Sequence, residues 1–241
     1  MPLTLLALRR GLSTGRPPRG PSRPSPPPPP APPQPPRDLA VPNGGWSGAM
    51  RRHYRHLLAM AAGGAWARLP SYRRARHHGA AAGTPGLGWV TPGVGGGRED
   101  TRLFLRAIDG DGKGFEYAMF LNAAERRLLC LVQPGPYLEG HPGLTHGGAI
   151  ATIIDSALGT CALAVAGPVV TANLSIDYLA PVPLGAVLLV EGRAERMEGR
   201  KVFLSGQVRG ADGDTLHARA TGLFIRPDPA KIQAQEEEGG R

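Results

Sequence analysis

Apolar residues recur in short runs from residue 115 onward, and their spacing predicts one sheet and one long helix. The runs 115–121 and 127–133 predict two strands, and residues 148–165, dominated by Ala, Ile and Leu, predict the helix. Alternating segments at 170–178, 186–195, 201–209 and 215–225 predict four further strands, with acid–glycine turns at 198–199 and 212–213. The order β-β-α-β-β-β-β predicts an α+β fold in which a mostly antiparallel sheet curls around a single helix.

A narrow polar stripe crosses this apolar helix. Thr152, Asp155, Ser156 and Gly159 follow one another at helical spacing. The helix opens at His146-Gly147-Gly148, where bare backbone N–H groups favour an anion. A carboxylate on an apolar face is costly unless it has a function or a partner. Donors for an oxyanion, together with a carboxylate that can act on water, are what an acyl hydrolase needs.

The segment 46–78 predicts one or two basic, amphipathic helices. Trp46, Met50, Tyr54, Leu57, Leu58 and Trp66 recur at steps of three and four residues, among many arginines. Such a helix packs on its own domain more often than it lies on an anionic membrane, so packing is the favoured interpretation and membrane contact the alternative. Glycine and proline at 79–98 predict a connector, which makes 38–98 a basic helical and linker extension.

Positive charge is concentrated before the predicted sheet. Residues 1–98 hold 14 basic residues and one acid, whereas residues 99–241 hold 14 basic residues and 18 acids. The formal charge of +9 therefore belongs to the first part, which argues against a nucleic-acid module in the second part. Residues 1–37 contain six arginines and no acid, which predicts a mitochondrial presequence, and 13 of the 20 residues at 17–36 are proline, which predicts an extended spacer. The expected domain spans 99–230, and the acidic end at 231–241 predicts a disordered tail.

The chain resembles the hotdog-fold thioesterases, and within them the subgroup of thioesterase superfamily members 4 and 5. The resemblance rests on the His-Gly-Gly helix start, Asp155, the strand Thr-Ala-Asn-Leu-Ser-Ile-Asp-Tyr at 171–178 and the Met-Glu-Gly-Arg-Lys turn at 197–201. It covers about residues 100–230 and implies hydrolysis of medium- to long-chain fatty acyl-CoA without metal or cofactor. It also implies a homodimer, or a higher oligomer, in the mitochondrial matrix, with a cytosolic or membrane-associated pool as an alternative.

The resemblance also implies roles for individual residues. Asp155 is the expected general base on water or the nucleophile, Gly147 and Gly148 the oxyanion donors, and Thr171 a hydroxyl near the water. His146 either forms a hydrogen bond with the thioester carbonyl or caps the helix. A metal site made by His141 and His146 is disfavoured, because no acidic or cysteine ligand lies at a supporting spacing. The expected CoA contacts are Gly148, Asn173, Asp177, Leu179, Arg200 and Lys201. Leu179 carries no charge where relatives often have a basic residue, which weakens the expected grip on the CoA phosphates.

Helix geometry gives a reason for the dimer. Eight residues separate Gly147 from Asp155, or about 12 Å along a helix, which is too far for both to touch one thioester. Two antiparallel helices would place the glycine of one chain near the aspartate of the other. The alternative functions are a regulatory hotdog protein that binds a protein kinase and has little or no thioesterase activity, and a hotdog dehydratase, which does not need an acid at position 155.

Overall fold

The computed structural model describes residues 38–71 and 110–228. The expected presequence and spacer at 1–37, the connector at 79–98 and the tail at 231–241 lie outside the described residues, as does the domain boundary expected at residue 99.

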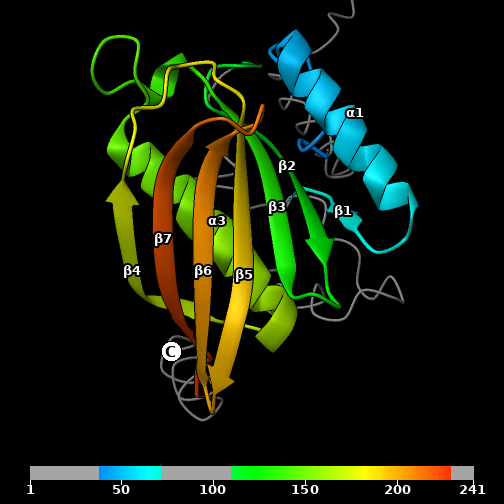
Figure 1. Ribbon diagram of the computed structural model, residues 1–241, viewed down its shortest axis with the longest axis vertical. Coiled ribbons are helices and arrows are strands. Elements are labelled where there is room, and N and C mark those ends of the chain that lie inside the picture. Colours follow the sequence, from blue (N-terminus) through cyan, green and yellow to red (C-terminus); the bar gives the residue numbers. More distant parts are fainter. Residues whose placement is uncertain (1–37, 72–109, 229–241) are drawn as a thin grey trace, which may run out of the picture. The chain divides into compact units, whose positions relative to one another are not determined.

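Within these described ranges, seven strands form one antiparallel sheet in the order β1-β2-β3-β5-β6-β7-β4 (Figure 1). The six strands expected from the apolar runs and the alternation are confirmed, with small differences at their ends. The strands are β1 (Ala67–Leu69), β2 (Phe115–Asn122), β3 (Arg127–Pro134), β4 (Val170–Tyr178), β5 (Leu188–Glu198), β6 (Lys201–Gly210) and β7 (Leu216–Ile225). A short 3-10 turn, η1 (Pro136–Leu138), follows β3.

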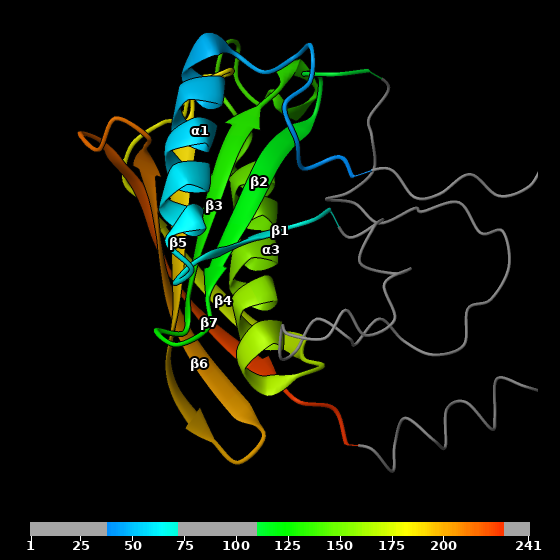
Figure 2. The same cartoon turned by 90° about the vertical axis from the view of Figure 1, so that its right-hand side faces the viewer.

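The long helix α3 (Gly147–Ala166) lies across one face of this sheet, so the predicted hotdog fold is confirmed (Figures 1 and 2). Within the described residues, α3 is the one helix long and apolar enough to cross a membrane, and half of its most apolar 18-residue stretch is buried inside the protein. Glycines on three neighbouring strands make room for it. A Cβ atom on Gly192 or Gly206, which face each other across β5 and β6, would lie 2.9 or 3.1 Å from the Leu158 side chain. The backbone of the sheet therefore fixes the position of α3, and with it the position of Asp155 one turn earlier.

Helix α1 (Gly48–Ala62) covers the opposite face of the sheet over β2 and β3 (Figure 2). This explains why these two strands are apolar along most of their length, since both of their faces are buried. One set of side chains on each strand faces α3, and the other set faces α1 in a second cluster: Trp46, Met50, Tyr54, Leu57, Ala118, Phe120, Leu129 and Leu131. The favoured interpretation, that this segment packs on its own domain, is confirmed, and its buried apolar stripe is not available to lipid.

The helical pattern expected over 46–78 is interrupted after residue 62, and its last part, 72–78, lies outside the described residues. Helix α1 stops at Ala62, and Gly64 turns the chain in the left-handed region at a φ of 85°. Residues 67–69 then form β1, because the free edge of β2 offers backbone partners that a second helix would leave unused. The salt bridge from Arg68 to Asp38, 2.8 Å long, ties the start of the described chain to this strand.

A buried glutamate anchors the segment that leads into α1. Glu116 on β2 accepts hydrogen bonds from the indole N–H of Trp46 at 2.7 Å and from the amide of Asn43 at 2.7 Å. The backbone N–H of Gly112 donates to its other oxygen at 2.6 Å. A buried carboxylate is tolerated here because its two oxygens receive three donors.

Candidate active site

The first turn of α3 presents one free backbone donor. His146 is the N-cap, and its Nδ1 accepts a hydrogen bond from the N–H of Gly148 at 2.9 Å. Among the described residues, the N–H of Gly147 has no hydrogen-bond partner. The expectation that both glycines donate to an oxyanion is therefore not supported for Gly148, whose N–H is already used by the cap. Gly147 remains the candidate donor, at the positive end of the helix dipole.

His146 is placed as a cap, one of the two roles left open by the sequence. Its backbone has the extended conformation usual for a capping residue, with φ −61° and ψ 136°. The accepting Nδ1 carries no proton, so a proton on the ring sits on Nε2. The ring also lies within 3.2 Å of the position that a Cβ on Gly140 would take, which holds the loop before the helix close to it.

Exchange of His146 for asparagine tests this role. Asparagine is among the best capping residues, so H146N is expected to keep the melting temperature and most of the hydrolytic rate, whereas H146A loses about 1 kcal/mol of stability. Thermal unfolding and steady-state kinetics measure the two effects. A large fall in kcat for H146N at unchanged stability would instead give the ring a direct part in the chemistry.

The structure brings Asp155 and Thr171 together. The hydroxyl of Thr171 on β4 donates to Oδ1 of Asp155 at 2.9 Å, and Oδ2 has no hydrogen-bond partner among the described residues. Asp155 is half-buried and Thr171 is exposed. A carboxylate with one oxygen held in place and the other open can accept a proton from water. The expected closeness of the hydroxyl and the acid is present.

The face expected for Thr171 was wrong. Strict alternation along 170–178 predicts that Thr171 shares a face with Asn173, Ser175 and Asp177. Instead, a β-bulge shifts the register between Thr171 and Asn173, so Thr171 pairs with Phe224 and points toward α3. The one extra residue reverses the pattern at that point. Asn173 and Asp177 pair with Leu223 and Arg219, and so they lie on the face of the sheet opposite α3.

A cavity of about 600 Å³ opens beside the start of α3. Its walls are mostly apolar and come from the loop before the helix, the first turn of α3 and the segment after β4. The lining includes Leu144, His146, Gly147, Ile150, Tyr178, Leu179 and Val182. Leu179, expected as a CoA contact, thus lies next to the candidate donor, together with His141.

Tyr178 is a site residue that the sequence interpretation did not select. Its hydroxyl donates to the carbonyl of Gly147 at 3.0 Å, and its ring would lie 3.8 Å from a Cβ on that glycine. The ring is 53% exposed and forms one wall of the cavity. Alternation did place Tyr178 on the apolar face of its strand, but only the packing of β4 against α3 puts it beside Gly147.

The remaining expected CoA contacts lie at the other end of the sheet. Arg200 and Lys201 are exposed at the tip of the β5–β6 hairpin, where Lys201 is level with the start of β4 through its pairing with Ile225. The cavity lies at the end of β4, beside Tyr178. Within one chain, therefore, the structure does not bring Arg200 and Lys201 to the start of α3. Arg200 lies 3.6 Å from Asp228.

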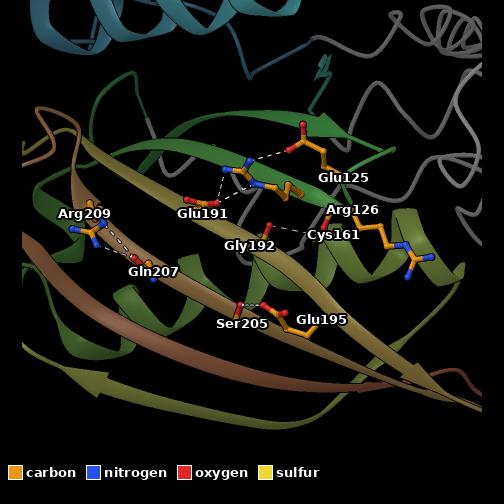
Figure 3. Close-up of polar contacts among 10 residues, drawn as sticks. Glu125, Arg126, Cys161, Glu191, Gly192, Glu195, Ser205, Gln207 and Arg209 are labelled. Carbon is orange, nitrogen blue, oxygen red and sulfur yellow. Dashed lines mark hydrogen bonds and ion pairs between the residues drawn. The ribbon is translucent and has the colours of Figure 1, made fainter. Parts of the chain in front are cut away.

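Neither cysteine has the environment of a nucleophile. Burial raises the pKa of the Cys161 thiol to about 11, and it raises the pKa of Cys130 well above its usual value. The sulfur of Cys161 lies 3.4 Å from the carbonyl oxygen of Arg126 and faces Gly192 on β5 (Figure 3). Both groups are protonated thiols at neutral pH, so a thiolate mechanism is not supported.

No group of three or more metal-binding side chains occurs within 38–71 and 110–228.

Known proteins are similar in sequence to this chain over most of its length. The profile of the thioesterase superfamily matches residues 142–217, from the loop before α3 into β7. Acyl-coenzyme A thioesterase THEM4 from Xenopus laevis is 47% identical over 193 residues, which cover 80% of this chain and 82% of that protein. The chain belongs to the acyl-coenzyme A thioesterases. The family resemblance inferred from the sequence is confirmed.

Two further sequence relatives agree with this assignment. Acyl-coenzyme A thioesterase THEM4 from Bos taurus is 44% identical and covers 81% of each chain, and acyl-coenzyme A thioesterase THEM5 from Mus musculus is 32% identical over 84% of this chain and 79% of that protein. Among solved structures, zebra fish thioesterase superfamily member 2 aligns with a TM-score of 0.42 at 19% identity, over 48% of this chain and 83% of that chain. The protein is an enzyme of the acyl-coenzyme A thioesterase type.

Proposed function

We propose that this thioesterase hydrolyses medium- to long-chain fatty acyl-CoA in a homodimer, with Asp155 as the general base. The observation that carries the proposal is the contact between Asp155 and Thr171, which holds one carboxylate oxygen and leaves the other open. Along α3, Asp155 lies about two helical turns, or roughly 12 Å, from the free N–H of Gly147. A thioester group is much smaller than that distance, so one site takes its base and its oxyanion donor from different chains.

The open edge of the sheet favours such a dimer. Among the described strands, β4 ends the sheet and pairs with β7 alone, and most of its residues are exposed. A nine-residue strand edge with unpaired backbone groups is a template for another strand. If β4 pairs with its own copy in antiparallel orientation, the start of α3 in one protomer comes to the end of the sheet that holds Asp155 and the hairpin tip in its partner. Arg200 and Lys201 of one protomer would then serve the cavity of the other, where they can bind CoA phosphates.

The proposed reaction needs no group beyond these side chains and water. Asp155 takes a proton from a water molecule, and the water oxygen attacks the thioester carbonyl carbon. The negative charge that develops on the carbonyl oxygen is stabilised by the N–H of Gly147 in the partner chain. Collapse of the tetrahedral intermediate breaks the carbon–sulfur bond, and the proton held by Asp155 passes to the CoA sulfur. The products are the free fatty acid and CoA.

Residues 1–37, rich in arginine and free of acids, support a mitochondrial matrix location as part of this proposal.

A panel of acyl-CoA substrates of increasing chain length tests the substrate class. We expect kcat/KM to rise from acetyl-CoA to the medium- and long-chain substrates, because the apolar cavity beside α3 gains contact area with each methylene. Release of CoA thiol from each substrate gives the rates. A preference for the shortest substrates would contradict the proposed class. No release from any of them would favour the protein-binding alternative.

A further inference from the structure

We infer that Tyr178 is a positioning residue for the oxyanion donor, because its hydroxyl holds the first turn of α3 in one orientation. The inference rests on the proposed function, in which the N–H of Gly147 stabilises the charge that develops on the thioester carbonyl oxygen. Tyr178 acts through the backbone of Gly147 and takes no part in the transfer of protons or in bond breaking.

Two hydrogen bonds fix the peptide unit between Gly147 and Gly148. The hydroxyl of Tyr178 donates to the carbonyl oxygen of Gly147 at 3.0 Å. The N–H on the other side of the same peptide unit, that of Gly148, donates to Nδ1 of His146 at 2.9 Å. Because a peptide unit is planar, contacts at both its oxygen and its nitrogen leave it little freedom to rotate.

The preceding peptide unit, between His146 and Gly147, is held at its oxygen. The carbonyl of His146 accepts hydrogen bonds from the N–H of Ala149 at 2.9 Å and from that of Ile150 at 3.1 Å. These two peptide units carry four polar groups, and three of them have hydrogen-bond partners among the described residues. The fourth is the N–H of Gly147. The proposed donor is therefore the one group left open in a backbone that is otherwise fixed.

The two glycines at the start of α3 explain why such a hold is needed. Glycine has no Cβ and adopts more backbone conformations than other residues, and the ends of helices fray. Gly147 and Gly148 in succession therefore give the first turn little order of their own. A hydrogen-bond donor stabilises a developing oxyanion most when it is aligned before the reaction, because no reorganisation is then required.

The sheet fixes the position of Tyr178. Tyr178 is the last residue of β4, which pairs with β7. The N–H groups of the next two residues, Leu179 and Ala180, both donate to the carbonyl of His217 on β7, at 2.8 and 3.1 Å. The ring of Tyr178 lies against Gly147, 3.8 Å from the position that a Cβ would take there. The hydroxyl therefore ties the start of α3 to a fixed point of the sheet.

Strand β4 thus holds both of the catalytic groups proposed on α3. Near its start, the hydroxyl of Thr171 donates to Asp155 at 2.9 Å, and at its end the hydroxyl of Tyr178 donates to the carbonyl of Gly147. β4 lies at the edge of the sheet (Figure 1). In the proposed dimer, one site takes the pair of Thr171 and Asp155 from one chain and the pair of Tyr178 and Gly147 from its partner.

Exchange of Tyr178 for phenylalanine tests the inference, because it removes the hydroxyl and keeps the ring. We expect Y178F to lower kcat by about three- to tenfold, the rate equivalent of one neutral hydrogen bond, with little change in KM. The melting temperature is expected to stay at the wild-type value, because the lost hydrogen bond is exposed. The matched control is Y137F, at a ring that is 57% exposed and does not line the cavity, and it is expected to keep the wild-type kcat and KM.

A double-mutant cycle with G147P separates this inference from the proposed function. Proline at position 147 removes the N–H through which Tyr178 acts, so adding Y178F to G147P should cause no further fall in kcat. An equal fall in both backgrounds, or a rise in KM with kcat unchanged, would overturn the inference, because the hydroxyl would then act independently of the donor. A wild-type kcat for Y178F beside an impaired G147P would also overturn it, and would leave the proposed donor in place. A wild-type kcat for G147P would remove the proposed donor itself, and the inference with it.

Discussion

Replacement of Asp155 by asparagine is expected to lower kcat for acyl-CoA hydrolysis by about 10²- to 10⁴-fold, the range for loss of a positioned general base. Asparagine keeps the shape of the side chain, and its oxygen can still accept the hydrogen bond from Thr171. The variant should therefore fold as the wild type does. It cannot take a proton from water at neutral pH, so the loss falls on the chemical step and KM should change little.

The same exchange at an exposed turn provides the control. Asp214 lies in the exposed turn between β6 and β7 and does not line the cavity, so D214N is expected to retain full activity. Thermal unfolding of both variants shows whether the fold is intact, and CoA release with a saturating substrate gives kcat. Near-normal turnover by a folded D155N enzyme would remove Asp155 from the mechanism.

Replacement of Gly147 by proline is expected to lower kcat by about 10²- to 10³-fold, as for loss of one oxyanion donor. Proline removes the N–H, yet it is favoured at the first position of a helix. The preceding residue, His146, already has the extended backbone that a residue before proline requires. The matched control is G147A, which keeps the N–H, because its Cβ would meet the Tyr178 ring at an ordinary contact distance of 3.8 Å. Comparable losses in the proline and alanine variants would mean that space at Gly147 matters and that its N–H does not.

Mixing the two inactive variants tests whether the site is shared. In a dimer of D155N with G147P, the intact glycine of the first chain meets the intact aspartate of the second, which restores one of the two sites. After unfolding and joint refolding, we expect about a quarter of the wild-type activity, because half of the randomly formed dimers are mixed and each has one good site. Activity no higher than that of the separate variants would place donor and base in the same chain, or leave the enzyme without a shared site.

The sequence predicted most of the local structure because the periodicities of this chain are clear. The alternation in β5, β6 and β7 and the apolar length of α3 each have one simple interpretation, and the glycine-rich turns separate them. Elements determined by distant contacts were predicted less well. β1 is three residues long and exists because the edge of β2 is available, and nothing in Ala67–Leu69 distinguishes it from the end of a helix.

The candidate site shows the same division. His146, Gly147 and Asp155 could be selected from the sequence, because a helix start and a carboxylate on an apolar face are local patterns. The position of Thr171 depends on a bulge, which no alternating pattern reveals. Tyr178 becomes a site residue only when β4 packs against the first turn of α3.

By itself, the sequence determined the family, the order of the elements, the acid and the helix start, because these rest on residue types and on spacings within one element. Only the tertiary structure decided three further matters. It assigned the N–H of Gly148 to a cap, it turned Thr171 toward Asp155, and it buried the apolar stripe of α1 so that only its basic side faces solvent. Each of these depends on the side chain or backbone that a residue meets from another element, and a linear pattern does not contain that information.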